Sequence, residues 1–427
     1  MTYIMHLTFS EETRMLRREI RRFVDEKFRP AIEEAEESID RYHDLGPSDP
    51  HLTDDVLPQP IAVPEETRDR LREESKELGF WAMGVPEEYG GAGLPLVDRC
   101  VVLEELSKHP LGLYQAGLGI IELGPGLTVG EPAAYLDAAS DEQIEEFFQP
   151  CIDGEKKSCF GLTEPAAGSD PRGMETRAER DGDEWVINGE KHFITYADEA
   201  DFVILFARTE PVGDIQNHGI TAFLVPFDTP GVTRPRSIPV IRPEYPFEIQ
   251  LDDARIPDDY RLDEVGAGLE LAKRCLTESR VLYAANSLGP IDQSIRMGME
   301  WANNRKVGGE PLADRQAIQW KIAKSAVDFQ AAKYSVYHAA WMFDDGQDAR
   351  HWSAMAKYQS TETLWTVLDR MVQIHGGMGV SADLPLERWL REARVRRIGE
   401  GPSEVHLKTM ARNLLKGYDD PDPIKQQ

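Results

Sequence analysis

The chain has few cysteines, no long apolar run and a deficit of basic residues. Its four cysteines, Cys100, Cys151, Cys159 and Cys275, show neither the Cys-x-x-Cys spacing of metal and redox sites nor the density of a disulfide framework. No segment approaches the ~18 apolar residues that cross a bilayer, and residues 1–14 lack the pattern of a signal peptide. We therefore expect a cytoplasmic protein with no membrane span, in which each cysteine is a small buried residue.

The charge balance excludes two classes of partner. Acidic residues number 76 against 48 basic residues, which gives a formal net charge of -28. Such a chain repels nucleic acid and anionic membranes, so we expect neither as a partner. The simplest interpretation of the acidity is a solvated surface. An anionic substrate would need a local basic anchor near its pocket.

Apolar periodicity predicts helices at both ends of the chain. Leu16, Ile20 and Phe23 recur at helical spacing, and the same spacing continues through a long stretch from Ile318 to Phe343. In the middle third, two apolar runs bounded by Gly, Pro and Asp indicate strands, at 202–206 and 221–225. Because 427 residues exceed what one core supports, we predict a mainly α protein with a middle β domain. The predicted division is an N-terminal helical domain at 1–155, a β domain at 156–267, a C-terminal helical bundle at 268–420 and a tail at 421–427.

Four short segments give local predictions. Pro64, followed by two acidic residues, predicts a helix start, and Ser140-Asp141-Glu142-Gln143 has the spacing of a capping box. Asn188-Gly189 lies between two apolar runs and predicts a two-residue hairpin turn, because both turn positions need positive φ. The segment from Ile39 to Pro64 is rich in Pro, Asp and Gly, which predicts either a long surface loop or an excursion at the rim of a pocket.

Two segments of small residues are candidate ligand loops. Thr163-Glu164-Pro165-Ala166-Ala167-Gly168-Ser169-Asp170 allows backbone N–H groups to approach an anionic or heteroaromatic ligand, with two hydroxyl donors. It matches neither the Walker loop nor Gly-x-Gly-x-x-Gly, and a structural turn explains the same composition. In Gln373-Ile374-His375-Gly376-Gly377 the glycine pair allows close approach to phosphate or ribose, although a helix C-cap would also use it. We expect His375 to be packed, and we expect no metal site.

The third candidate is a carboxylate near the C-terminus. Glu400-Gly401-Pro402-Ser403-Glu404-Val405-His406 follows the basic stretch 391–397. A Glu followed by Gly is ordinarily a solvated loop residue. The same residue type suits proton abstraction, because a carboxylate becomes a stronger base when water leaves its pocket.

Taken together and in this order, the segments 159–170, 373–379 and 398–406 resemble the acyl-CoA dehydrogenases. The resemblance covers about residues 8 to 416 and implies that family's fold: N-terminal helices, a β-barrel-like middle domain and a C-terminal four-helix bundle. It implies non-covalent FAD and oxidation of an acyl-CoA to the 2-enoyl-CoA. It also implies an electron-transfer flavoprotein as electron acceptor and assembly as a homodimer or homotetramer. Glu400 would be the general base, because Ser279 occupies the position that holds the base in some other members.

The resemblance also implies a set of contact residues. Substrate contacts fall on Ser169, Arg280 and Gly401. Flavin contacts fall on two segments, and a third set would receive the adenosine-diphosphate end of the FAD of a neighbouring subunit. The cofactor residues implied are Phe160, Leu162, Thr163, Ser169, Phe193, Ile194, Thr195, Arg305, Gln316, Gln373, Gly376, Gly377, Pro402 and Glu404.

The chain departs from the usual family pattern at three of these residues and at a neighbouring glycine. Phe193 stands where a Trp is usual, and Gly308, beside Arg305, stands where a Phe is usual. Pro402 and Glu404 replace Thr and Gln, which is closer to the Asp-Gly-Pro-Asp-Glu-Val-His form of one divergent branch. Acyl-chain length depends on the glycine-rich segment from Leu113 to Gly130, whose course the sequence does not fix.

Other functions remain open at this point. The same fold hosts flavin oxidases, monooxygenases and lyases that act on unusual acyl groups, and Glu400 is compatible with each of them. A catalytically silent binding or assembly subunit is the alternative outside enzymology. Hydrogen peroxide formed in air would indicate an oxidase, and a colourless protein that refuses FAD would indicate a silent subunit.

Overall fold

The computed structural model describes residues 9–31, 33, 64–113, 133–209, 219–242 and 246–416. The loop predicted at 39–64 lies outside these residues except for Pro64, and so do residues 114–130 of the glycine-rich segment and the tail at 421–427. The chain divides into two compact units: residues 1–30, 95–117 and 280–427 form a helical unit, and residues 31–94 and 118–279 form a sheet unit. The three-domain division stays a prediction. None of the described helices is long and apolar enough to cross a membrane.

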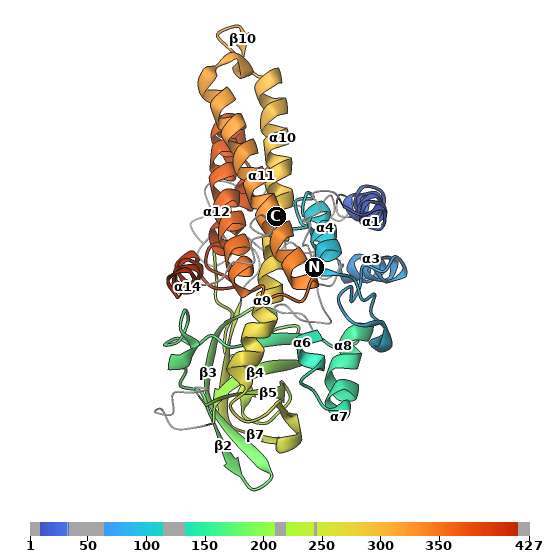
Figure 1. Ribbon diagram of the computed structural model, residues 1–427, viewed down its shortest axis with the longest axis vertical. Helices are drawn as coiled ribbons and strands as arrows, with labels where there is room; N and C mark the ends of the chain where they lie inside the picture. Colours follow the sequence, from blue (N-terminus) through green and yellow to red (C-terminus); the bar gives the residue numbers. More distant parts are fainter. Residues whose placement is uncertain are drawn as a thin grey trace, which may run out of the picture. The chain divides into compact units, whose positions relative to one another are not determined.

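The helical unit is built from long helices, and α10, α11 and α12 run alongside one another with the β9–β10 turn at one end (Figure 1). The long helix predicted from 318 to 343 is confirmed as α11. The elements of this unit are α1 (Glu11–Phe23), the π turn η1 (Val24–Phe28), α4 (Leu96–Leu106), α10 (Leu288–Asn304), β9 (Lys306–Val307), β10 (Glu310–Pro311), η6 (Leu312–Asp314), α11 (Gln316–Asp344), α12 (Arg350–His375), η7 (Gly376–Val380), α13 (Leu386–Arg396) and α14 (Ser403–Leu415). Helix α9 (Gly268–Asn286) begins in the sheet unit and ends in the helical unit.

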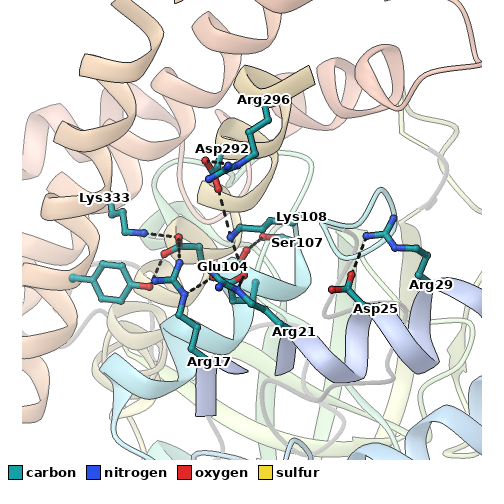
Figure 2. Close-up of polar contacts among 12 residues, drawn as sticks. Arg17, Arg21, Asp25, Arg29, Glu104, Ser107, Lys108, Asp292, Arg296 and Lys333 are labelled. Atoms are coloured by element: carbon teal, nitrogen blue, oxygen red, sulfur yellow. Dashed lines mark hydrogen bonds and ion pairs between the residues drawn. The ribbon is translucent and has the colours of Figure 1, made fainter. Parts of the chain in front are cut away.

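Two buried carboxylates tie four helices of this unit together (Figure 2). Glu104 and Glu105 of α4 are 1% and 2% exposed. Glu105 accepts from Arg17 of α1 at 2.5 Å, and Glu104 accepts from Lys333 of α11 at 2.6 Å. Lys108, at the end of α4, is 3.4 Å from the Asp292 carboxylate of α10. Because the buried acids have several cationic partners, they act as a structural brace.

The sheet unit contains an eight-stranded sheet in the order β6-β7-β3-β2-β4-β5-β8, with β1 paired to β4. Neighbouring strands are antiparallel except for β1 and β2, which pair parallel with β4. The strands are β1 (Ser158–Gly161), β2 (Arg177–Asp181), β3 (Glu184–Ile194), β4 (Phe202–Arg208), β5 (Ile220–Pro226), β6 (Val232–Thr233), β7 (Phe247–Pro257) and β8 (Arg261–Leu262). The other elements are α3 (Glu65–Glu77), η2 (Glu87–Tyr89), α6 (Ala133–Leu136), α7 (Asp141–Gln143), the π turn η3 (Ile144–Phe148), α8 (Gln149–Asp153), η4 (Pro171–Gly173) and η5 (Asp258–Tyr260).

Strand β4 is buried along its whole length because it serves two cores. Phe202 and Ile204 join a cluster with Phe148 and the first turns of α9, while Val203 and Leu205 join a second cluster with residues of β3 and β7. Because successive side chains of a strand point to opposite faces, the sheet has an apolar cluster on each of its faces, which fits the expected middle β domain. The strands predicted at 202–206 and 221–225 are confirmed as β4 and β5.

The local predictions have mixed outcomes. Helix α3 begins after Pro64, and the capping box at Ser140 and Gln143 forms in both directions, so both predictions are confirmed. The hairpin at Asn188-Gly189 is wrong, because β3 runs straight through these residues with a register shift against β7. The hairpin lies earlier, between β2 and β3, with Gly182 at φ +70 in its turn. A Cβ on Gly189 would lie 2.5 Å from the Thr176 hydroxyl oxygen, so this glycine marks a close approach inside a bulged strand.

Candidate active site

The sheet unit brings the two predicted flavin segments side by side. Phe160 lies on β1, and the chain continues directly to Thr163. The second segment, with Phe193, ends β3. The His192 N–H donates to the Thr163 carbonyl at 2.9 Å, which joins the two segments edge to edge. The sequence order alone did not establish this pairing.

A buried ion pair fixes the shape of the first loop. The Lys191 ammonium, with 0% exposure, donates to Glu164 at 2.6 Å. The Glu164 carboxylate also accepts the backbone N–H groups of Glu175 at 2.5 Å and Thr176 at 3.1 Å. Burial lowers the pKa of Lys191 to about 8 although Glu164 opposes the shift. Burial would raise the pKa of Glu164, but the Lys191 ammonium and the N–H donors lower it overall. Both ends of the loop are therefore held by one carboxylate.

The exposed groups of these segments suit a planar heteroaromatic ligand. Phe193 is 51% exposed and has φ +59, a backbone conformation that non-glycine residues adopt at a cost. Within the described part of the chain, the side-chain hydroxyls of Thr163 and Ser169 have no hydrogen-bond partner. The Thr195 hydroxyl accepts from Arg242 at 3.2 Å, so its own proton is left for another acceptor. The Ile194 side chain is buried in the sheet core, and Ile194 pairs with Phe247 of β7.

In the helical unit, Glu400 lies in a turn with unusual backbone geometry. The turn joins α13 to α14, and Glu400 and Gly401 have φ +58 and +90. Arg280 Nε of α9 donates to the Glu400 carbonyl at 3.0 Å. The Gly401 carbonyl accepts from Lys357 Nζ of α12 at 2.7 Å and from His406 Nε2 of α14 at 3.0 Å. Three helices thus hold two successive carbonyls and impose the left-handed conformation on Glu400.

The flanks of this turn are anchored by a second carboxylate. Glu362 of α12 accepts from the Ser403 hydroxyl at 2.5 Å and from Arg397 Nε at 2.8 Å. Ser403 begins α14, and Arg397 follows the last residue of α13. One carboxylate therefore fixes both ends of the segment that contains Glu400.

The charges around Glu400 are coupled. Burial lowers the pKa of Lys357 to about 7, and the Glu400 carboxylate is the main influence that raises it. Burial also lowers the pKa of Arg280, which is half-buried, against the same carboxylate. Burial lowers the pKa of His406 to about 3, so this ring is neutral at neutral pH and donates to Gly401 through Nε2–H. Opposite charges of this kind favour the ionised form of a carboxylate, which is the form that accepts a proton.

Most of the remaining predicted cofactor residues lie at the surface near the ends of α10 and α12, and two belong to the Glu400 segment. The Trp301 ring lies 5.2 Å from the His375 ring, so the ends of α10 and α12 are neighbours. His375 is buried with Nδ1 2.7 Å from the Met371 carbonyl, in agreement with a packed role. The exposed residues near these helix ends are Arg305, Gln316, Gln373, Gly376 and Gly377. The half-buried Gly401 and Pro402 and the exposed Glu404 belong to the Glu400 segment.

The two adjacent glycines differ in what they require. Gly376 caps α12 with φ +64, so the helix-cap explanation accounts for it. A Cβ on Gly377 would meet no atom within 4 Å, so the described packing does not require a glycine there. Open backbone at Gly377, the exposed Arg305 guanidinium, the Phe193 ring and the hydroxyl donors of Thr163 and Ser169 fit the phosphates and the ring system of FAD.

Sequence reasoning did not assign a role to four residues that shape these sites: Glu164, Lys191, Lys357 and His406. One of them had a signal. The buried stripe of Leu364, Leu368 and Met371, extended backwards at helical spacing, reaches Lys357. A lysine on an apolar stripe is an anomaly that indicates a buried charge. Glu164 and Lys191 lie far apart in sequence, and nothing local connects them.

The chain is similar to known proteins along most of its length. Three family models match: acyl-CoA dehydrogenase N-terminal domain at residues 53–155, middle domain at 159–243 and C-terminal domain at 266–415. The chain is 36% identical over 346 residues to the mitochondrial short-chain specific acyl-CoA dehydrogenase of Bos taurus, covering 80% of this chain and 81% of that protein. It is 35% identical over 355 residues to (R)-benzylsuccinyl-CoA dehydrogenase of Thauera aromatica, covering 83% and 86%.

A solved structure agrees. Butyryl-CoA dehydrogenase of Megasphaera elsdenii superposes with a TM-score of 0.81 at 27% identity, covering 96% of this chain and 100% of that chain. The predicted fold class and the predicted FAD dependence are thereby confirmed. The chain belongs to the acyl-CoA dehydrogenase family, whose members are FAD-dependent oxidoreductases.

Proposed function

We propose that this chain oxidises an acyl-CoA thioester to the 2-enoyl-CoA, with Glu400 as the general base. The observation that supports this most directly is the left-handed turn at Glu400, held through its carbonyls by Arg280, Lys357 and His406. Strained geometry that three helices maintain is typical of a functional residue. A carboxylate in that position has the chemistry needed to take a proton from the carbon next to a thioester.

The residues of the chain divide the work of the reaction. Glu400 takes the α proton, and its backbone N–H donates to the thioester carbonyl, which stabilises charge on that oxygen. Arg280, Gly401 and Ser169 are the proposed substrate contacts. Because the whole chain carries a charge of -28, cations beside the turn supply the local attraction for anionic CoA. A bound FAD would supply the hydride acceptor for the β hydrogen.

We assign the flavin ring to the sheet-unit residues Phe160, Leu162, Thr163, Phe193, Ile194 and Thr195, with Ser169 beside them, and a further contact to Pro402 and Glu404. The adenosine-diphosphate end falls to Arg305, Gln316, Gln373, Gly376 and Gly377 of a second copy. His375 and Lys357 are separated by five turns of α12, about 27 Å of helix axis, so the two ends of this helix would serve different active sites.

A second copy also has a surface to bind. Trp320, Val327 and Tyr334 of α11 are spaced by seven residues and are 57%, 69% and 54% exposed. They share one helix face, as residues at heptad spacing do. We propose that this face contributes to a homodimer or homotetramer. Sedimentation of Val327→Glu, expected to be a smaller species than the wild-type chain, tests the assignment; an unchanged mass would remove this face from the interface.

Substrate and electron acceptor form the finer part of the proposal. The relatives include a short-chain enzyme and a benzylsuccinyl-CoA enzyme, which span simple and aromatic acyl groups. We propose a CoA thioester as substrate, an electron-transfer flavoprotein as acceptor and the cytoplasm as location. All four cysteines are buried and none forms a disulfide, which supports a reducing compartment. A panel of CoA thioesters with an artificial acceptor gives chain length, and hydrogen peroxide assayed in air separates the oxidase alternative.

The test of the base is Glu400→Gln. We expect flavin content to stay the same and anaerobic flavin reduction by acyl-CoA to fall at least ~100-fold, because a positioned base is lost. Glu300→Gln, an exposed change on α10, is the matched control and should reduce its flavin at the wild-type rate. Near-normal reduction in Glu400→Gln would show that another residue removes the proton.

A further inference from the structure

Lys357 is a fully buried lysine that contacts the catalytic turn. Its side chain is 0% exposed, and its Nζ donates to the Gly401 carbonyl at 2.7 Å. Among the residues that the structure describes, it forms no ion pair with a carboxylate within hydrogen-bonding distance. Burying an ammonium group without a contacting anion is costly. The cost calls for an explanation other than packing.

Satisfying the Gly401 carbonyl does not explain the lysine. That oxygen already accepts from His406 Nε2 at 3.0 Å, and His406 is neutral at neutral pH. A carbonyl with one good donor is satisfied. The lysine therefore adds two things to the turn: a second donor that fixes the direction of the carbonyl, and a positive charge.

The Lys357 charge lies near groups from its own helix and from four surrounding elements. Glu400 from the turn is the strongest influence favouring the ammonium form. Arg280 of α9 and Arg396 of α13 oppose it, Glu362 of α12 supports it, and the neutral His406 of α14 shares its acceptor. The influence is mutual, because a cation that is stabilised by a carboxylate stabilises that carboxylate equally.

We propose that Lys357 is a positioning residue for Glu400: it fixes the left-handed turn through the Gly401 carbonyl, and its charge favours the ionised form of the Glu400 carboxylate. The inference rests on the proposed role of Glu400 as base. Burial places the pKa of Lys357 at about 7, so its charge weakens as the pH rises through neutrality. The hydrogen bond does not need the charge, because a neutral amine also donates. Charge and position are thus separable by experiment.

The experiment uses the FAD-loaded enzyme with Lys357→Met, Lys357→Gln and Lys357→Arg. Methionine removes donor and charge, glutamine keeps a donor without charge, and arginine keeps both. Lys324→Met, an exposed change on α11, is the surface control. The first readout is the protonation state of Glu400, monitored by infrared spectroscopy. The Glu400 signal is the difference between the spectrum of each variant and that of the same variant with Glu400→Gln added. The second is the pH dependence of anaerobic flavin reduction.

We expect the Glu400 titration to move up by about one pH unit in Lys357→Met and Lys357→Gln, the lower end of what an opposite charge contributes. The titration should match wild type in Lys357→Arg and Lys324→Met. Flavin reduction at pH 6 should fall by up to about tenfold in Lys357→Met, the most that a shift of one unit can produce, and by less in Lys357→Gln. Above pH 8 the variants without charge should converge on wild type in their Glu400 ionisation, because wild-type Lys357 is then largely neutral.

Two results would overturn the proposal. One is an unchanged Glu400 titration in both uncharged variants. The other is an equal loss of activity in Lys357→Met and Lys357→Arg with no shift of the titration, which would mean packing alone. The infrared readout does not depend on turnover. If Glu400→Gln retained normal flavin reduction, the proposed function would fail. The infrared titration of Glu400 would still decide whether Lys357 sets the protonation of Glu400.

Discussion

The two fully buried lysines discussed above lie in different units and have opposite surroundings. Lys191 in the sheet unit contacts the Glu164 carboxylate at 2.6 Å, and the remaining lone pairs of that carboxylate are occupied by backbone N–H groups. Lys357 in the helical unit contacts a neutral carbonyl at 2.7 Å. The carboxylate that most strongly raises its pKa, Glu400, belongs to a turn with positive φ. One lysine belongs to a closed ion pair, and the other is a cation held next to a strained turn.

The difference separates structural from functional burial of charge. A closed pair, like the Glu104 and Glu105 network, neutralises itself and holds segments together. A cation bonded to a carbonyl leaves its field directed at a neighbouring group, here the proposed base. The same residue type therefore braces the loop proposed to hold the flavin in one unit and, in our proposal, adjusts the proposed base in the other.

The largest effect should come from breaking the closed pair. Lys191→Met leaves the Glu164 carboxylate buried without its cation, so we expect a loss of about 3–5 kcal/mol in the free energy of unfolding. Urea denaturation measures this. Adding Glu164→Gln to the same chain removes the stranded charge and keeps an acceptor for the loop N–H groups, so much of the loss should be recovered. If Lys191→Met alone were as stable as the wild-type chain, the distinction between the closed pair of Lys191 and the functional burial of Lys357 would be contradicted.

Removing the other lysine should have the opposite sign. The folded pKa of Lys357, about 7, lies below its ordinary value of 10.5. Below pH 7 both states carry the proton and the folded chain bears the full cost of the buried charge. Between pH 7 and 10.5 the unfolded chain binds more protons, so wild-type stability rises with pH. At pH 6 the free energy of unfolding of Lys357→Met should therefore be about 1–3 kcal/mol higher than that of the wild-type chain.

The difference in the free energy of unfolding between Lys357→Met and the wild-type chain should narrow as the pH increases from 7 towards 10. Thermal or urea unfolding of both chains across this range checks the prediction, with Lys324→Met as the surface control. If Lys357→Met were less stable than wild type at pH 6, the lysine would be a structural brace like Lys191. A Lys357→Met variant that is more stable but reduces its flavin more slowly is the combination expected when a residue serves function at the expense of stability.

The smallest effect concerns the shared carbonyl. His406→Leu removes one of the two donors to Gly401, and Lys357 still satisfies the oxygen, so we expect a loss of about 1 kcal/mol. In a Lys357→Met background the same change leaves the carbonyl without either donor. The two changes together should therefore cost more than the sum of the single effects, which a double-mutant cycle in urea would measure. Simple additivity would mean that the two side chains do not share the oxygen energetically.

Sequence patterns were reliable where structure is local. The period of α11, the strands β4 and β5 and the capping box at Ser140 depend on neighbours within a few residues, and all were confirmed. The Asn188-Gly189 prediction failed because the same dipeptide suits a turn or a bulge. Only the approach of Thr176 to Gly189 decides between them. The glycine pair at 308 and 309 does form a two-residue turn, between β9 and β10, with positive φ at both positions.

The sequence by itself determined the family, the order of helices and strands, and the candidate residues, because these follow from spacing along the chain. Only the tertiary structure decided which candidates are held and by what. Glu164 meets Lys191 across 27 residues, and Lys357 meets Gly401 across 44. Contacts between residues so distant in sequence depend on how helices and strands pack. The same packing sets burial, and burial sets the cost and the influence of every charge near Glu400.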